Sequence, residues 1–143
     1  MRRFLVVLAW LGVIVFLPGV IGAQDVKSHV DRGLANCESG RFDQALKDFN
    51  EALKVKPNDP SLYDYRGMAY RCKGMDDKAI QDFNKAMELD PKFARAYRNR
   101  AMVYFDKGNF DKSVADLKQA QSLGYKIDED FLKMVIRRAA EKK

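Results

Sequence analysis

A 34-residue repeat constrains the fold of this 143-residue chain more than any other feature. Residues of similar kind recur at that interval in six separate columns, and a period of about 20–50 residues is typical of a repeat array. The columns are Gly40, Gly74 and Gly108; Asp43, Asp77 and Asp111; Ala45, Ala79 and Ser113; Phe49, Phe83 and Leu117; Ala52, Ala86 and Ala120; Pro57 and Pro91. The chain is therefore expected to be a stack of similar units, each packed on its neighbours.

Each unit has the pattern of two helices joined by a tight turn. Ala45, Phe49 and Ala52 are spaced by four and three residues, so they lie on one face of a helix. Gly40 supplies the permissive backbone that ends the helix before it, and Pro57 closes the second helix because proline cannot continue one. The acidic residue three places after each glycine is expected at the N-cap or in the first turn of the second helix. A small residue in each first helix lets the paired helices approach closely: Gly33, Gly67 and Ala101.

The segment 128–141 continues the helical pattern beyond the last unit. Its apolar residues recur at helical spacing, with acids at the start and bases at the end, as a helix dipole favours. A repeat array needs a terminal element over its last apolar face, so this segment is predicted to be a capping helix; a partner-binding helix is the alternative. The sequence predicts an all-α fold with helices at 26–39, 42–55, 60–73, 76–89, 94–107, 110–123 and 128–141.

The repeating residues resemble the tetratricopeptide repeat family over residues 26–125. The second unit carries Tyr63, Gly67, Tyr70, Gly74, Ala79, Phe83, Ala86 and Pro91, and the third carries Tyr97, Ala101, Tyr104, Gly108, Ser113, Leu117 and Ala120. Departures from the pattern are His29 and Asn36 in the first unit, Asp76 in the second, and Gly124-Tyr125 in place of a proline in the third. The resemblance implies a right-handed α-solenoid of three repeats, at 26–59, 60–93 and 94–125, followed by the capping segment 126–143.

The segment 1–23 has the three parts of a secretory signal peptide. Arg2 and Arg3 give a positive start, the run 4–17 is apolar and uncharged, and small residues precede Gln24. This predicts an exported chain, periplasmic or secreted, with residues 1–23 outside the fold. An uncleaved segment that anchors the chain in a membrane is the alternative, since the apolar character extends past Pro18.

Composition argues against an enzyme. The chain has one histidine and two cysteines, and it contains no Gly-rich phosphate loop, HExxH or GxSxG motif. No cofactor and no metal site is therefore expected, and His29 is interpreted as a packing residue.

The charge balance bears on nucleic-acid binding. Lys and Arg outnumber Asp and Glu by 26 to 20. Lysines alternate with acids, as in Lys47-Asp48 and Asp111-Lys112, so no single-sign stripe forms. A nucleic-acid-binding helical repeat is kept as the alternative function, and the charge pattern does not favour it.

Resemblance to the family implies a concave groove, lined by the first helices, that holds a partner segment. Groove positions assigned by analogy include Leu34, Met68, Arg71, Arg95, Arg98, Met102 and Phe105. Methionines adapt their shape and guanidinium groups bind carboxylates, so the expected partner is a protein or peptide segment with apolar and acidic side chains. The alternative is a solvated face whose arginines pair with Asp64 and Asp106. The predicted function is a non-enzymatic interaction module.

Some family members bind acidic chaperone C-termini through a five-residue carboxylate clamp of two Lys, two Asn and one Arg. The corresponding places here hold Val30, Leu34, Tyr65, Arg95 and Asn99. Only Arg95 keeps the charge type, so the clamp is absent and a cytosolic chaperone partner is not expected.

The two cysteines, Cys37 and Cys72, are separated by one position more than the repeat period. An oxidising compartment would permit a disulfide between them. The one-residue offset rotates their side chains by about 100° relative to equivalent places, so two free thiols are predicted and the disulfide is the alternative.

Overall fold

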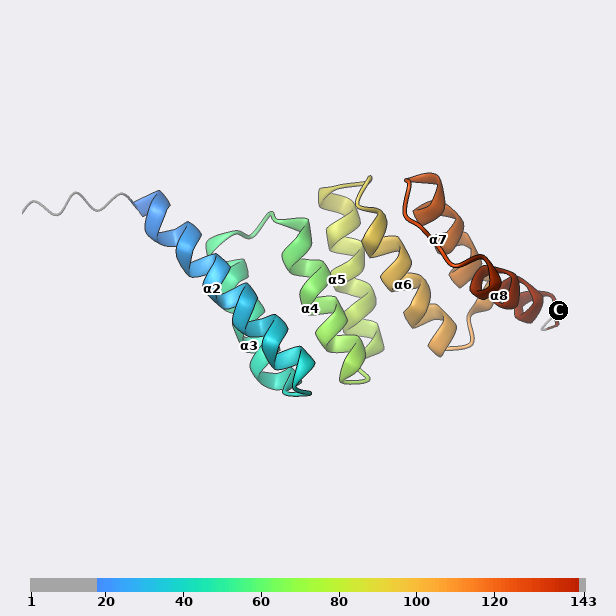
Figure 1. Ribbon diagram of the computed structural model, residues 1–143, viewed down its shortest axis with the longest axis horizontal. Helices are drawn as coiled ribbons and strands as arrows, with labels where there is room; N and C mark the ends of the chain where they lie inside the picture. The colour runs from blue at the N-terminus through green and yellow to red at the C-terminus, as the bar shows by residue number, and fades with distance from the viewer. Residues whose placement is uncertain (1–17, 142–143) are drawn as a thin grey trace, which may run out of the picture.

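The computed structural model describes residues 18–141, which form seven α-helices (Figure 1). The helices are α2 (Pro18–Glu38), α3 (Phe42–Val55), α4 (Pro60–Cys72), α5 (Asp76–Leu89), α6 (Ala94–Asp106), α7 (Phe110–Ser122) and α8 (Glu129–Glu141). The three pairs α2–α3, α4–α5 and α6–α7 are the three repeat units, each a helical hairpin packed on the next.

The predicted helix ends are confirmed to within one residue from α3 onward. The turn inside each unit depends on glycine, because Gly40, Gly74 and Gly108 have φ of 70°, 76° and 69°, a region that strains other residues. The acidic column lies in the first turn of each second helix, as with Asp43 of α3, while the N-cap residues make no side-chain capping hydrogen bond.

Helix α2 extends further toward the N-terminus than the predicted range 26–39. The signal-peptide pattern predicts that residues 18–23 lie outside the fold, yet α2 begins at Pro18, and a Cβ on Gly22 would contact Val55 of α3 at 3.4 Å. Pro18 is the first described residue, and a helix over residues 18–23 leaves cleavage and export as predictions. The other part of the predicted signal segment, residues 1–17, lies outside the described residues.

Close packing inside the first two units depends on a glycine set against an aromatic ring. A Cβ added to Gly33 would lie 2.6 Å from the ring of Phe49, and one on Gly67 would lie 2.7 Å from that of Phe83. Both rings are fully buried. The small-residue prediction is therefore confirmed in these two units.

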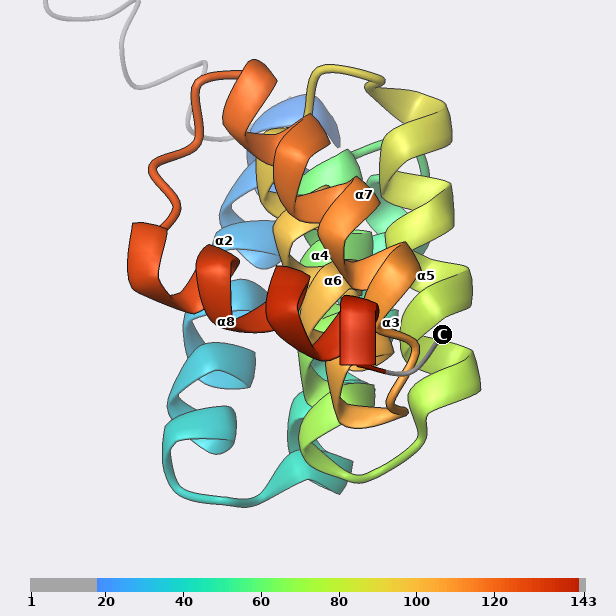
Figure 2. The ribbon, with the colours of Figure 1, turned by 90° about the vertical axis from the view of Figure 1, so that its right-hand side faces the viewer.

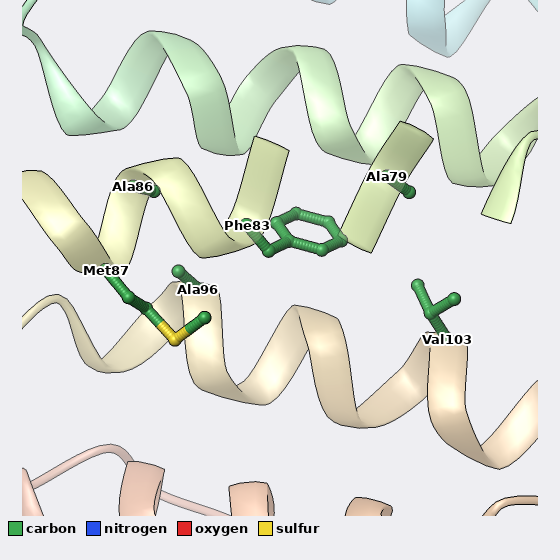
Figure 3. Close-up of a cluster of buried hydrophobic side chains, with 6 residues drawn as sticks. All are labelled: Ala79, Phe83, Ala86, Met87, Ala96 and Val103. Atoms are coloured by element: carbon green, nitrogen blue, oxygen red, sulfur yellow. The ribbon is translucent and has the colours of Figure 1, made fainter. Parts of the chain in front are cut away.

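The core continues from one unit into the next. Figure 3 shows Phe83 and Ala79 of α5 beside Ala96 and Val103 of α6, in a single buried cluster. The first helices also contact one another, α2 with α4 and α4 with α6. They form one face of the stack.

Helix α8 covers the end of the array. Figure 2, which looks onto that end, shows α8 lying across α6 and α7. Val135 of α8 is fully buried in a cluster with Leu117 and Ala120 of α7 and Ala101 of α6. This is the place that a capping helix must occupy.

Candidate functional site

The seven predicted groove residues all lie on the first helices of the units: Leu34 on α2, Met68 and Arg71 on α4, and Arg95, Arg98, Met102 and Phe105 on α6. Their surroundings differ. Met68 is 41% exposed and Met102 is half-buried, so both offer apolar surface to a partner. Leu34 instead packs against the buried cluster around Phe49.

Arg95 is engaged by a carboxylate of its own chain. Its Nε lies 2.7 Å from Oδ2 of Asp64, a residue with no exposed surface, although the two atoms are not aligned as a hydrogen bond. Asn99 donates to the other carboxylate oxygen at 2.9 Å. The guanidinium of Arg95 lies 4.7 Å from the ring centroid of Tyr65 and 5.3 Å from that of Phe93. Arg95 is thus held from three sides.

Burial dominates the electrostatics of Asp64. Loss of water raises the pKa of its carboxyl above the ordinary value, even though Arg95 and Asn99 favour the charged form. Three of the places that a carboxylate clamp would use, those of Tyr65, Arg95 and Asn99, therefore serve an internal network around Asp64.

Arg71 is also paired. Its Nη2 donates to Asp106 at 2.7 Å and its Nε donates to the same oxygen at 2.9 Å, across the boundary between the second and third units. Both pairings that the solvated-face alternative anticipated, Arg95 with Asp64 and Arg71 with Asp106, are present.

Arg98 differs from both. It donates to Oδ1 of Asn99 at 3.1 Å and has no ion-pair partner among residues 18–141. It lines a pocket of about 280 Å³ where α6 meets the segment that leads into α8. The pocket lining is Arg98, Met102, Leu117, Tyr125, Lys126, Ile127, Asp128 and Phe131.

The pocket lining combines apolar side chains with two basic residues and one acid. Ile127 and Leu117 are buried in its wall, and Phe131 adds an aromatic ring. Lys126 is exposed and, like Arg98, has no ion-pair partner in the described part of the chain. Asp128 is occupied as an acceptor, since its Oδ1 takes the backbone N–H of Phe131 at 2.7 Å. The pocket can accept an apolar side chain together with an anionic group.

Phe105 of α6 packs against the capping helix α8. Its ring centroid lies 5.6 Å from that of Phe110 and 5.6 Å from that of Phe131 on α8. The sequence places Phe105 by analogy with the repeat, which does not show where the terminal helix crosses.

A second periodic set of polar residues is absent from the sequence-based prediction. Arg66 donates from Nε and Nη2 to both oxygens of Asp82 at 2.7 Å, and its Nη1 reaches Asn50 of the preceding unit, also at 2.7 Å. The equivalent residues of the next unit repeat this arrangement: Arg100, Asp116 and Asn84. The repeat period marks these columns too, so a search of the period for polar residues would have found them.

The first unit has a variant of this pair. Arg32 donates to Asp48 at 2.7 Å, and Asn36 donates to the same carboxylate at 3.0 Å. Burial opposes ionisation of Asp48, yet these partners hold its pKa below the ordinary value. His29 lies 2.8 Å from Arg32 through Nδ1, consistent with a packing and polar-network role.

The opposite face holds a larger hollow of about 770 Å³ between α3, α4 and α5. Its lining carries five basic residues against two acids, Asp43 and Glu51. Lys54 pairs with Glu51, and Lys73 pairs with Asp43.

None of the helices within residues 18–141 is long and apolar enough to cross a membrane. No cluster of three or more potential metal ligands occurs in that range.

Comparison with known proteins gives a consistent picture of the fold. Two family models match the chain: "TPR repeat" at residues 33–74 and 67–108, and "Tetratricopeptide repeat" at 94–123. No curated protein matches the chain.

Several solved structures have the same fold. The TPR domain of Arabidopsis OM64 is 21% identical with a TM-score of 0.76, over 85% of this chain and 99% of that domain. The TPR2B domain of yeast Sti1, solved as a complex with pHsp70, is 22% identical with a TM-score of 0.73, over 84% and 99%. The first TPR of Spaghetti (RPAP3), bound to an HSP90 peptide, is 21% identical with a TM-score of 0.75, over 82% and 94%.

Proposed function

The chain belongs to the tetratricopeptide repeat family, and on that premise we propose that it is a non-enzymatic interaction module that binds a short protein segment on the face formed by α2, α4 and α6. The segment carries an apolar side chain beside a carboxylate. The observation that carries this proposal is Arg98, an arginine without an ion-pair partner in the described residues, which lines a pocket together with apolar side chains.

The family relatives support binding of a peptide, and the residues of this chain support a different anchor for it. The Sti1 and RPAP3 domains are named as complexes with pHsp70 and an HSP90 peptide. Here Arg95 and Asn99 are engaged by Asp64, so the partner's carboxylate meets Arg98 and Lys126 instead. Arg98 donates to Asn99 through Nη1 alone, so its other N–H groups can donate to a partner's carboxylate without breaking an ion pair.

Nucleic-acid binding is the weaker alternative. The hollow on the opposite face has several lysines, but Asp43 and Glu51 neutralise part of that charge. A phosphate backbone is bound by a continuous basic stripe, which this arrangement does not provide.

Export is part of the proposal and rests on the signal-like residues 1–23. Cleavage after Ala23 would shorten α2 by its first turns and leave Val26, the first buried residue among the described side chains. N-terminal sequencing of the native protein, recovered from envelope or medium, tests this. An intact Met1 in a soluble cytoplasmic fraction contradicts export.

Binding is tested by selection from a displayed random-peptide library, followed by calorimetry with the enriched peptides. We expect enriched sequences to combine an apolar and an acidic residue. Arg98→Ala should weaken their binding by about 1.5–3 kcal/mol, the usual contribution of a hydrogen bond to a charged group, which is about 10–150-fold in Kd.

Arg98 is a cleaner probe than Arg95, whose removal would leave the buried carboxylate of Asp64 without its cation. Arg138→Ala, an exposed arginine of α8 outside the pocket, is the matched control and should bind normally. Equal affinity of Arg98→Ala and wild type would place the binding site elsewhere.

A further inference from the structure

The boundary between the first and second units repeats the boundary between the second and third. Lys73 donates to Asp43 across the first boundary, and Lys107 donates to Asp77 across the second. The asparagine contacts of Arg66 and Arg100 cross the same two boundaries in the same way. Since each contact recurs one repeat period later, the two boundaries share one geometry.

Across the second boundary, the residues of α4 and α6 that contact each other are 35 positions apart in the sequence, one more than the 34-residue period. Asn99 donates to Asp64 at 2.9 Å, and Arg71 donates to Asp106 at 2.7 Å. The sequence-based expectation that a one-residue offset turns the side chains apart is therefore wrong. Neighbouring units are rotated relative to each other, so residue i of one first helix faces residue i+35 of the next.

The two cysteines occupy this facing position at the first boundary. Cys37 lies one repeat period before Arg71, and Cys72 lies one period before Asp106. The places equivalent to Asp64 and Asn99 hold Val30 and Tyr65, which pack in one cluster between α2 and α4. These places precede the cysteines by about two helical turns, so both pairs share one line of contact.

The environment of each thiol fits that placement. Cys37 is half-buried and packs in a cluster that includes Ala69 of α4, while Cys72 is exposed at the last residue of α4. Both thiols are free in the structure, as predicted. We propose that Cys37 and Cys72 are a facing thiol pair that closes to a disulfide by exchange with a disulfide oxidant, and that the bond fastens α2 to α4.

The exchange has two steps. The exposed thiol of Cys72 loses its proton to water, and its thiolate attacks one sulfur of the oxidant, forming a mixed disulfide and releasing one oxidant thiolate. The Cys37 thiol then loses its proton, and its thiolate attacks Sγ of Cys72 and expels the second oxidant thiolate. The two cysteines are oxidised, the oxidant is reduced to two thiols, and the released protons balance their charge.

The order of the steps follows from burial. Burial raises the pKa of the Cys37 thiol, and the nearby charges of Cys72 and Glu38 raise it further. Cys72 is exposed and meets the oxidant first, so the half-buried Cys37 acts as the resolving cysteine.

The 35-residue offset brings short side chains of neighbouring first helices into contact at the second boundary. A disulfide needs Cα atoms within about 7 Å, and the direct contact of two short side chains, Asp64 and Asn99, shows that the same offset brings the first helices close. The bond would join the ends of the two helices that carry Leu34 and Met68, and so fix the spacing of that part of the binding face.

The test uses the folded full-length chain and oxidised glutathione, with mass measurement and thiol titration after acid quenching. We expect a monomer lighter by two hydrogens, with no titratable thiol and an upward shift in Tm. A lasting glutathione adduct on Cys72, a disulfide-linked dimer, or two remaining free thiols would each overturn the proposal.

Two variants test the register itself. The double variant Arg71→Cys, Cys72→Ser moves one cysteine by a single position. Its two thiols are then separated by one repeat period, and no disulfide should form between them. Transferring the pair to the second boundary, with Arg71→Cys and Asp106→Cys in a Cys37→Ser, Cys72→Ser background, should restore closure. Equal closure at the two spacings would show that chain motion, not the facing register, brings the sulfurs together, and would refute the assignment.

Discussion

The two boundaries between repeat units have the same geometry and opposite chemistry. At the second boundary the first helices meet through charges, with Asn99 and Arg95 on Asp64 and with Arg71 on Asp106. At the first boundary the equivalent places hold an apolar pair and two thiols. At both boundaries the buried side chains fix how neighbouring units align. The residues through which the first helices contact each other can therefore differ.

This difference gives each boundary its own sensitivity. The second boundary contains a buried carboxylate and an exposed ion pair, which respond to pH and salt. The first contains no charged residue at these places and responds, under our proposal, to thiol oxidants. Two boundaries with the same alignment of helices can thus respond to different conditions, one to pH and salt and the other to oxidants.

The largest effect should come from removing the buried ring of either unit. Phe49→Ala and Phe83→Ala each leave a cavity at a fully buried site and should cost about 3–5 kcal/mol of the free energy of unfolding. Phe49 also stacks on Tyr65 across the first boundary, with centroids 5.8 Å apart. Its loss should therefore cost about 0.5–1.5 kcal/mol more than that of Phe83. Urea unfolding followed by circular dichroism measures both, and an equal cost would show that the apolar boundary gains nothing from the stack.

A smaller effect, visible as pH dependence, should follow Asp64→Asn. Burial raises the folded-state pKa of Asp64 above its unfolded value of about 3.9, so stability is greatest below that value and is lost as pH rises through the folded-state pKa. Asparagine cannot ionise, so this loss should disappear from the unfolding free energy measured between about pH 4 and 7.

Asp48→Asn is the control with the opposite sign. The folded-state pKa of Asp48 is lowered, so its contribution is present above the unfolded value and lost as pH falls. This variant should lose stability at neutral pH and be less sensitive to acid. Parallel pH curves for wild type and Asp64→Asn would contradict a raised pKa at Asp64.

The smallest effect should come from Arg71→Ala. The Arg71–Asp106 pair is partly exposed, with side chains 30% and 42% accessible, so its removal should cost about 0–1 kcal/mol and less at high salt. Cys37→Ala, the equivalent change at the first boundary, should show no salt dependence. Thermal unfolding at low and high salt compares the two variants. If the stability that Arg71→Ala loses does not depend on salt, packing of the aliphatic part of Arg71 matters more than its charge.

The helices were predictable because their signals are local. Gly40, Gly74 and Gly108 mark the turns, prolines follow the second helices, and small residues face aromatic rings. The helical conformation of residues 18–23 was not predicted, because the apolar run and Pro18 were interpreted as part of a signal peptide.

The candidate site was predicted only in part. Helical spacing placed Met68 and Arg98 on the first helices, and both residues lie there in the structure. The pairing of Arg95 with Asp64 depends on the rotation between units, which a linear period does not give. The pocket beside Arg98 depends on the loop before α8, where Lys126 and Ile127 lie outside any repeated column.

The side-chain contacts of Arg66 and Arg100 have a consequence for the length of such a chain. Arg66 and Arg100 each hold an aspartate of their own unit and an asparagine of the unit before. A tandem copy of residues 60–93 would bring its own arginine, its own aspartate and the asparagine that the following copy needs. The contacts of these two arginines can therefore be repeated one module at a time. The contacts between first helices cannot, because the boundary between two copies would set Tyr65 against Asp64 and Cys72 against Arg71, where the present chain has Asn99 and Asp106.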